Sequence, residues 1–91
     1  LNLKKFNLEV NKMRKYKIRV DTKSDITKIM GIIDSAEGDV FLLNQGVEDG
    51  TEFRVNAKSL LGFTLAVCEW PEKWLKCDAD LYTAIKDFVI A

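Results

Sequence analysis

The chain has 91 residues and no net charge, with 47% apolar and 31% charged residues. This composition is typical of one soluble globular domain, and the length is too short for a deep cleft between two lobes. The sequence contains no histidine, which excludes any mechanism that depends on an imidazole as base, nucleophile or metal ligand.

The first twelve residues are predicted to be a basic extension outside the fold. Residues 1–19 hold seven Lys or Arg and one acid, a net charge of +6, whereas residues 20–91 hold seven basic and thirteen acidic residues, a net charge of −6. The first methionine is Met13, and codons for residues 7–13 can contain a ribosome-binding sequence before an ATG. We therefore interpret residues 1–12 as a translated leader and residues 13–91 as the single domain.

The first strand and the first helix are predicted from periodicity. Residues 16–20 alternate apolar and charged side chains, which is typical of a half-buried strand. Thr22 and Asp25 have the spacing of a capping box, with Ser24 as a competing N-cap. The helix that follows should end between Ser35 and Gly38, because glycine suits a left-handed cap. The expected core residues are Tyr16, Ile18, Val20, Ile26, Ile29, Met30 and Ile33.

A hairpin with a long loop is predicted next. Residues 39–44 form a short apolar segment, and residues 51–56 alternate again, with Phe53 and Val55 on the inward side. Between them, residues 45–50 carry turn chemistry that ends in an Asp-Gly pair.

A second helix is predicted to begin at Ser59, which suits an N-cap position. It should end before Pro71, because a residue that precedes proline is disfavoured in the helical conformation. Trp70 and Trp74 are expected to pack in the interior. The residues that keep helical spacing on the expected core side are Leu61, Leu65 and Cys68.

The two cysteines, Cys68 and Cys77, are expected to be small buried hydrophobic residues. A pair of cysteines does not complete a structural zinc site, which needs four ligands. A disulfide framework in so short a chain usually has more cysteines. We therefore expect no metal and no cofactor.

The last strand is predicted over residues 73–77, and Asp78 and Asp80 should open a final helix, where their charge suits the positive end of the helix dipole. The apolar stripe of this helix is Leu81, Ala84, Ile85 and Phe88. The element order is thus β-α-β-β-α-β-α. It predicts an α+β, open-faced two-layer sandwich, with a four-stranded, largely antiparallel sheet and three helices on one face.

One segment resembles a known family. Residues 55–62, Val-Asn-Ala-Lys-Ser-Leu-Leu-Gly, are similar to the V-N-x-K-S-I-M-G signature of HPr, the histidine-containing phosphocarrier of the bacterial sugar phosphotransferase system. The signature covers eight residues, and the element order matches that of the family from Tyr16 to Phe88. The resemblance implies an HPr-like fold.

The chain departs from the family at the phosphate-accepting loop. In HPr this loop, between the first strand and the first helix, carries the histidine followed by Ala-Arg-Pro. Here the loop holds no histidine, arginine or proline and is about three residues shorter. We therefore expect a protein that is not an enzyme and cannot relay a phosphoryl group through histidine. The degenerate loop consists of Thr22, Lys23, Ser24 and Asp25.

The signature helix is the candidate site. Ser59 matches the serine that a kinase phosphorylates in some bacteria to control catabolite repression, and its simpler role is that of an N-cap. The resemblance also implies a partner surface around this helix. The candidate partner-surface residues are Lys58, Leu60, Leu61 and Thr64.

These observations predict a cytoplasmic regulatory or adaptor protein that binds another protein: a regulator, a kinase or a transport component. No apolar run approaches the roughly 18 residues of a membrane span, so we expect no membrane insertion. The alternative is a small nucleic-acid-binding protein that uses the basic N-terminal arm, which the acidic remainder of the chain disfavours. A further alternative is a homodimer joined through the signature helix.

Overall fold

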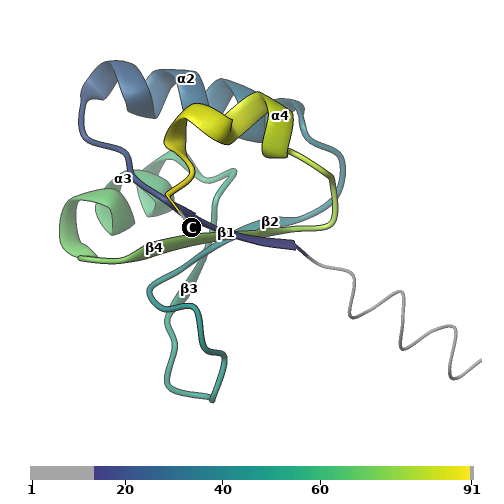
Figure 1. Cartoon of the computed structure of the whole chain (residues 1–91). Coiled ribbons are helices and arrows are strands. Elements are labelled where there is room, and N and C mark those ends of the chain that lie inside the picture. Colours follow the sequence, from purple (N-terminus) through teal and green to yellow (C-terminus); the bar gives the residue numbers. More distant parts are fainter. Residues whose placement is uncertain (1–13, 91) are drawn as a thin grey trace, which may run out of the picture.

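The computed structural model describes residues 14–90, so the expectations for residues 1–12 lie outside the described residues. The elements along the chain alternate between strands and helices (Figure 1). In order they are β1 (Arg14–Ile18), α2 (Lys23–Ser35), β2 (Val40–Leu43), β3 (Arg54–Asn56), α3 (Leu60–Glu69), β4 (Lys73–Cys77), α4 (Tyr82–Ile85) and the 3-10 turn η1 (Lys86–Phe88).

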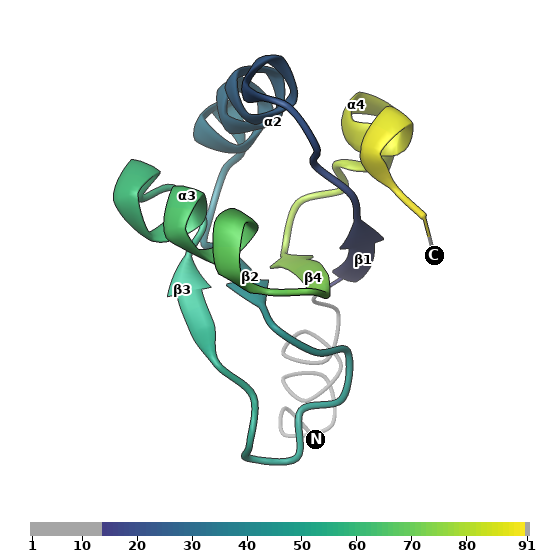
Figure 2. The same cartoon turned by 90° about the vertical axis from the view of Figure 1, so that its left-hand side faces the viewer.

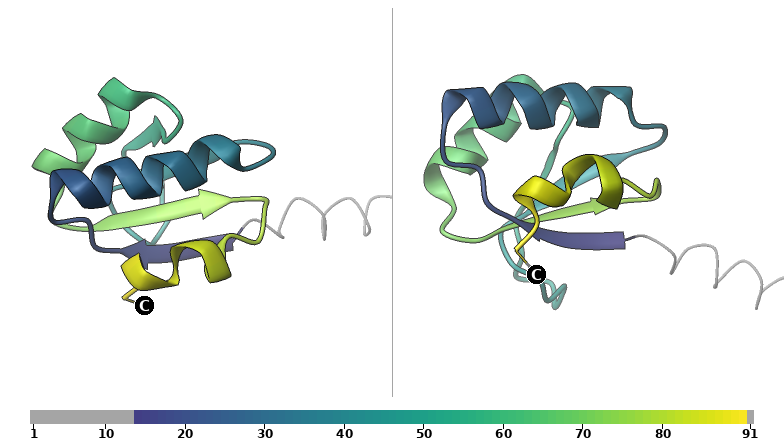
Figure 3. Two further views of the ribbon diagram at one scale, coloured as in Figure 1. Left: turned by 90° about the horizontal axis from the view of Figure 1, so that it is seen from above. Right: turned by 45° about the horizontal axis from the view of Figure 1, so that its top comes forward.

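The four described strands form one antiparallel sheet in the order β1-β4-β2-β3. The last strand of the chain therefore lies between the first two. Helices α2, α3 and α4 all cover the same face of this sheet (Figure 2). Seen from the helix side, α2 lies between α3 and α4 (Figure 3). This arrangement confirms the predicted α+β sandwich. Within residues 14–90 no helix covers the other face of the sheet (Figure 2), which we call the helix-free face in this sense.

The core lies between the sheet and the helix layer. The central inward positions of the strands are buried, in line with the alternation of strand side chains. They are Ile18, Val40, Leu42, Leu75 and Cys77. The largest fully buried side chains of this cluster are Phe63, Ile29, Ile33, Leu42, Leu75, Ile85, Val40 and Cys77. No helix among residues 14–90 is long and apolar enough to cross a membrane.

Helix α2 begins at the predicted capping box. The Thr22 hydroxyl accepts a hydrogen bond from the Asp25 backbone N–H at 3.0 Å, and the Asp25 carboxylate accepts one from the Thr22 N–H at 3.3 Å. These bonds satisfy two helix-end donors that have no partner within the helix, so Thr22 is the N-cap and Ser24 is not. Helix α2 ends at Ser35, and Gly38 then takes a positive φ of 79° that lets the chain turn into β2.

The predicted core side of α3 is wrong. Leu61 and Leu65 are 70% and 52% exposed and Cys68 is also exposed, whereas Phe63 and Ala66 are buried. Both sides of this helix are apolar, so helical spacing alone does not identify the side that packs into the core. The residues that follow helical spacing on the true core side are Phe63, Ala66, Val67 and Trp70.

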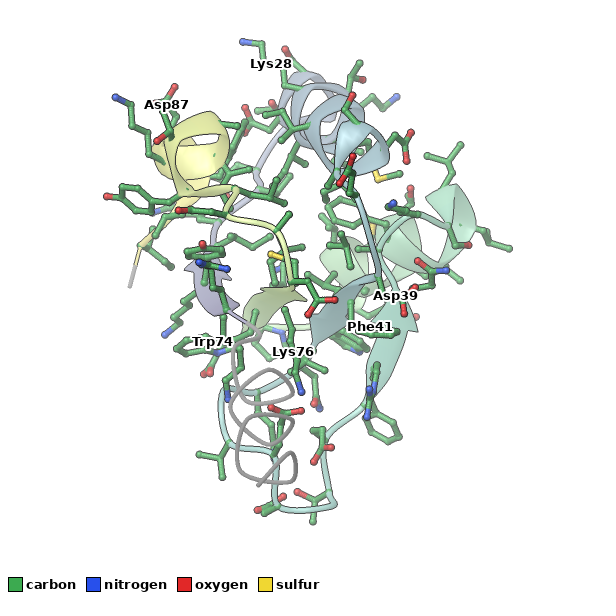
Figure 4. All side chains as sticks on the ribbon, turned by 90° about the vertical axis from the view of Figure 1, so that its right-hand side faces the viewer. Lys28, Asp39, Phe41, Trp74, Lys76 and Asp87 are labelled. Atoms are coloured by element: carbon green, nitrogen blue, oxygen red, sulfur yellow. The ribbon has the colours of Figure 1, made fainter. Side chains whose placement is uncertain are left out.

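Three other expectations for buried residues fail. Trp74 is only half-buried and points away from the helix layer (Figure 4). Phe53 is 67% exposed, because β3 begins only at Arg54 and the preceding loop projects from the side of the sheet that lacks helices (Figure 1). Ala84 is exposed, because α4 is a single short turn that buries Leu81 and Ile85 but presents Ala84 to a surface depression. The expected burial of Cys77 is confirmed.

Candidate functional site

Residues of the signature segment make the hydrogen bonds that join β3 to the start of α3. The Asn56 side-chain oxygen accepts a hydrogen bond from the Lys58 N–H at 2.9 Å, and the Asn56 carbonyl accepts one from the Ser59 N–H at 3.0 Å. The Lys58 ammonium donates to the Ala36 carbonyl at 2.7 Å, which ties the start of α3 to the end of α2. Lys58 is thus half-buried, and its ammonium group is held by a hydrogen bond within the fold.

Ser59 caps α3. Its hydroxyl accepts a hydrogen bond from the Gly62 N–H at 3.3 Å, and the residue itself is exposed. A Cβ at Gly62 would lie 3.5 Å from the Ser59 hydroxyl and from Val55, which is ordinary van der Waals contact, so the packing of α3 on β3 does not require glycine here. The Ser59 hydroxyl is accessible at the positive end of the helix dipole, where a phosphate would find unpaired N–H groups.

An apolar surface runs along α3 beyond Ser59. Leu60 is 66% exposed, and with Leu61 and Leu65 it makes three leucines that are each more than half exposed on one ten-residue helix. Thr64 lies half-buried among them, and the Cys68 thiol is exposed one turn further on. We call this surface the leucine face, which consists of Leu60, Leu61, Thr64, Leu65 and Cys68.

Thr22 and Asp25 of the degenerate loop cap the N-terminus of α2. The hydroxyl of Thr22 and the carboxylate of Asp25 both bond the backbone at the start of α2, and Lys23 and Ser24 are exposed. A surface depression adjoins this loop and is lined by two cations and three carboxylates. Its charged residues are Arg19, Asp21, Asp25, Lys28 and Asp87. Figure 4 shows Lys28 and Asp87 on the helix side of the molecule.

This depression is not suited to a bound phosphate, because three carboxylates face it and the nearest arginine is already paired. The Arg19 guanidinium contacts the Asp21 carboxylate at 2.9 Å. Among residues 14–90 no group of three His, Cys, Asp or Glu side chains could hold a metal ion.

The two cysteines differ in reactivity because they differ in burial. Burial raises the pKa of the Cys77 thiol, whose sulfur donates to the Ala79 carbonyl at 3.2 Å. Cys77 is therefore a poor nucleophile. Cys68 lies on the leucine face, where its thiol can report whether that surface is covered.

The helix-free face of the sheet carries a second cluster that sequence reasoning missed. In cross-strand register, Lys17 lies beside Trp74, and Lys15 beside Lys76. Lys76 in turn lies beside Phe41 of β2. Figure 4 shows Phe41, Trp74 and Lys76 pointing away from the helix layer. The alternation of each strand could have indicated outward positions, but the sequence does not say which strands are neighbours.

The loop at residues 44–53 is pinned to this helix-free face. The Glu48 carboxylate contacts the Lys76 ammonium at 2.6 Å and the Lys15 ammonium at 3.4 Å. Lys15 also donates to the Gly46 carbonyl at 2.6 Å. At Gly46 an added Cβ would approach the Trp74 ring to 2.9 Å, so the loop backbone lies directly against the indole.

The loop contact is expected to depend on pH. The hydrogen bond from Lys76, with its charge and that of Lys15, lowers the pKa of Glu48 below its ordinary value. A carboxyl whose pKa is lower in the folded than in the unfolded state stabilises the folded state at pH values above the unfolded pKa. This stabilisation is lost as the pH falls through the lower, folded-state pKa. We expect Glu48→Gln to lower the free energy of unfolding by less than about 1 kcal/mol at neutral pH, because these charges are partly solvated.

Urea titration of both proteins at about pH 7 and about pH 2.5 measures this difference, since an ordinary glutamate has a pKa of about 4.3. The two proteins should differ at neutral pH and converge in acid. An equal difference at both pH values would show that the carboxylate charge is not what holds the loop.

Comparison of the chain with protein-family models, with curated proteins and with solved structures gives no match.

Proposed function

We propose that this chain is a non-enzymatic, HPr-like adaptor that acts in the cytoplasm and binds a partner protein through the leucine face of α3. The observation that carries the proposal is the exposure of three leucines on one short helix. Scattered exposed leucines are ordinary in soluble proteins, but a contiguous apolar stripe on one helix is characteristic of an interaction surface.

Two features support the HPr-like character of this adaptor. Asn56, Lys58 and Ser59 of the signature segment make hydrogen bonds at the start of α3, and the element order is the one that the resemblance implies. The loop that would accept a phosphoryl group instead caps α2 with Thr22 and Asp25. The proposed role is therefore binding and regulation without phosphoryl relay.

The partner in this proposal is a regulator, kinase or transport component that presents an apolar groove to α3. The leucine face itself contains no charged residue, and Lys58 is anchored to α2. Affinity should therefore come from apolar burial and change little with salt, because screening weakens only interactions between charges.

The test begins with capture of partner proteins from a native lysate by the unchanged chain, and each captured protein is then purified. The affinity of each for the full chain is compared with its affinity for the chain in which Leu61 and Leu65 are replaced by aspartate. Val47→Asp is the matched control, because Val47 is equally exposed at 68% but lies on the loop away from α3. We expect the double variant to lose binding by at least about tenfold, since two contact leucines are lost. Unchanged affinity of the leucine variant for every partner would contradict the proposal.

The Cys68 thiol gives an independent measure. Its rate of reaction with a thiol reagent should fall when the partner covers the leucine face, whereas a partner bound elsewhere leaves the rate unchanged. Sedimentation velocity over a range of concentrations, on the chain and on Leu61→Asp, tests the homodimer alternative. Self-association that the substitution abolishes would identify a second copy as the occupant.

Regulation at Ser59 is the finer part of the proposal. Ser59 is exposed at the start of α3 beside the leucine face, so a phosphate there would change the charge of the binding surface. With the family's kinase and ATP, we expect a phosphoserine mass shift that Ser59→Ala removes. The family's phosphoenolpyruvate-dependent enzyme should give no acid-labile phosphoprotein. Stoichiometric labelling by that enzyme would contradict the non-relay role.

A further inference from the structure

The helix-free face of the sheet combines cations with aromatic rings. Its cations and rings come from all four strands, and none of the eight outward positions in the described strands is acidic. The remaining two outward positions are Leu43 and Asn56. We call this surface the open face, and its six principal residues are Lys15, Lys17, Arg54, Lys76, Phe41 and Trp74.

Two of the four cations of the open face lie over its rings. The Lys17 ammonium is 5.9 Å from the centre of the Trp74 ring, and the Arg54 guanidinium is 5.0 Å from the centre of the Phe41 ring. Cation–π contacts of this kind hold a positive charge beside an aromatic surface. The two pairs therefore place phosphate-binding and ring-stacking groups next to each other on neighbouring strands.

An anionic group already occupies the centre of this face. The Glu48 carboxylate lies between the ammonium groups of Lys15 and Lys76, at 3.4 and 2.6 Å. The two lysines are cross-strand neighbours, so both can contact one anion. A phosphate oxygen is negatively charged and accepts hydrogen bonds from ammonium groups, as this carboxylate oxygen does. It could therefore replace the carboxylate between the same two lysines.

We propose that the open face binds single-stranded nucleic acid. The four cations contact phosphates, and Phe41 and Trp74 stack on bases, which is how proteins without sequence preference hold single strands. In the unbound protein cations lie over both rings and the loop at Gly46 lies against the indole, so these groups must move aside when a strand binds. In the unbound protein, Glu48 takes the place of one phosphate and closes the face. This site is distinct from the basic segment at residues 1–12, and it lies on the opposite side of the sheet from the leucine face.

The burial of the apolar residues favours a nucleic acid over a membrane surface. Phe41 and Trp74 are half-buried within the sheet, and Leu43 between them and Arg54 is fully buried. None of these three apolar side chains protrudes, whereas a lipid surface takes up protruding apolar side chains beside the cations. A half-buried ring can still stack on a planar base once the groups above it move. Rings on this face can stack only on accessible bases, so a single strand suits it better than a duplex, whose bases are paired inside.

The experiment uses the full chain and a fluorescent oligo(dT) of about 12 nucleotides, within the usual site size of single-strand-binding folds. Anisotropy titration measures affinity at several salt concentrations. We expect binding that weakens steeply with salt, and Lys17→Glu with Arg54→Glu should weaken it by at least about tenfold. Lys28→Glu with Lys86→Glu makes the same charge change on the helix side and should alter affinity by less than about twofold.

Two further variants separate the parts of the proposal. Glu48→Gln removes the competing carboxylate and should strengthen binding by about threefold or more. Phe41→Leu keeps an apolar side chain but removes a ring, and should weaken binding by about fivefold or more. Inorganic polyphosphate, which has charge but no bases, should compete poorly with the oligonucleotide.

Several outcomes would overturn the proposal. If the double variant at Lys17 and Arg54 binds as tightly as the unchanged chain, the open face is not the binding site. If binding is lost only when Lys4, Lys5 and Lys12 are replaced by glutamine, the basic segment is the binding site. Polyphosphate that competes as well as the oligonucleotide identifies a general polyanion site. Binding to anionic vesicles in preference to the oligonucleotide identifies a membrane surface. Variants of the leucine face leave all these results unchanged, so the two functional proposals can fail separately.

Discussion

Replacement of Phe63 by alanine is expected to lower the free energy of unfolding by about 3–5 kcal/mol. Phe63 is fully buried and is the largest of the fully buried side chains. Its removal would leave a cavity between α3 and the sheet that the surrounding strands cannot fill by small shifts. A domain of this size has a total stability of only about 5–15 kcal/mol, so the variant should be near the threshold of unfolding. Urea denaturation followed by circular dichroism measures the change.

Leu61→Ala is the matched control, because it removes a side chain of similar apolar character two residues earlier on the same helix. Leu61 is 70% exposed, so the stability should change by less than about 0.5 kcal/mol. If instead Leu61→Ala proved costly and Phe63→Ala mild, α3 would be rotated so that the leucines face the core. The leucine face would then not exist, and the proposed docking function would be lost with it.

Gly46→Val is expected to lower the free energy of unfolding by about 1–3 kcal/mol, the usual range for overpacking. A Cβ at Gly46 would lie 2.9 Å from two atoms of the Trp74 ring. The indole cannot easily move, because its ring N–H donates to the Glu72 carboxylate at 2.6 Å. The loop must therefore lift, which breaks the bond from Lys15 to the Gly46 carbonyl and separates Glu48 from its lysines.

The control for a glycine substitution is Gly31→Ala. Gly31 lies inside α2, and an added Cβ there would meet no atom within 4 Å. Alanine should raise the stability by about 0.5–1 kcal/mol, because glycine costs more conformational entropy within a helix. Amide hydrogen exchange over residues 45–50 completes the test, since Gly46→Val should accelerate it and Gly31→Ala should not. Unchanged exchange in the Gly46 variant would show that the loop does not rest on Trp74.

Gly46→Val also connects stability with binding. If the open face accepts single strands, displacement of the loop uncovers Lys15 and Lys76 and should strengthen oligonucleotide binding even as the fold weakens. Opposite changes in stability and affinity are a signature of a loop that competes with the ligand for the same lysines.

The leucine face shows how far sequence reasoning reached at the candidate site. Leu60, Leu61 and Thr64 were assigned to a partner surface by resemblance, and the structure places all three on one side of α3 with Leu65. Helical spacing instead predicts Leu61, Leu65 and Cys68 on the core side, and all three are exposed. Helical spacing could not decide between the two sides, because leucines line one side of α3 and Phe63 with Ala66 lines the other.

The sequence by itself determined the local structure of this protein: the order of strands and helices, the capping box of Thr22 and Asp25, and the cap at Ser59. These features depend on contacts between residues a few positions apart, so the pattern that specifies them is present in a short segment. Only the tertiary structure decided which side of α3 faces the core and which strands stand side by side. Lys15 meets Lys76, and Lys17 meets Trp74, only because β4 inserts beside β1. Such pairings join distant segments through burial of the whole sheet against its helices, and no local pattern encodes them.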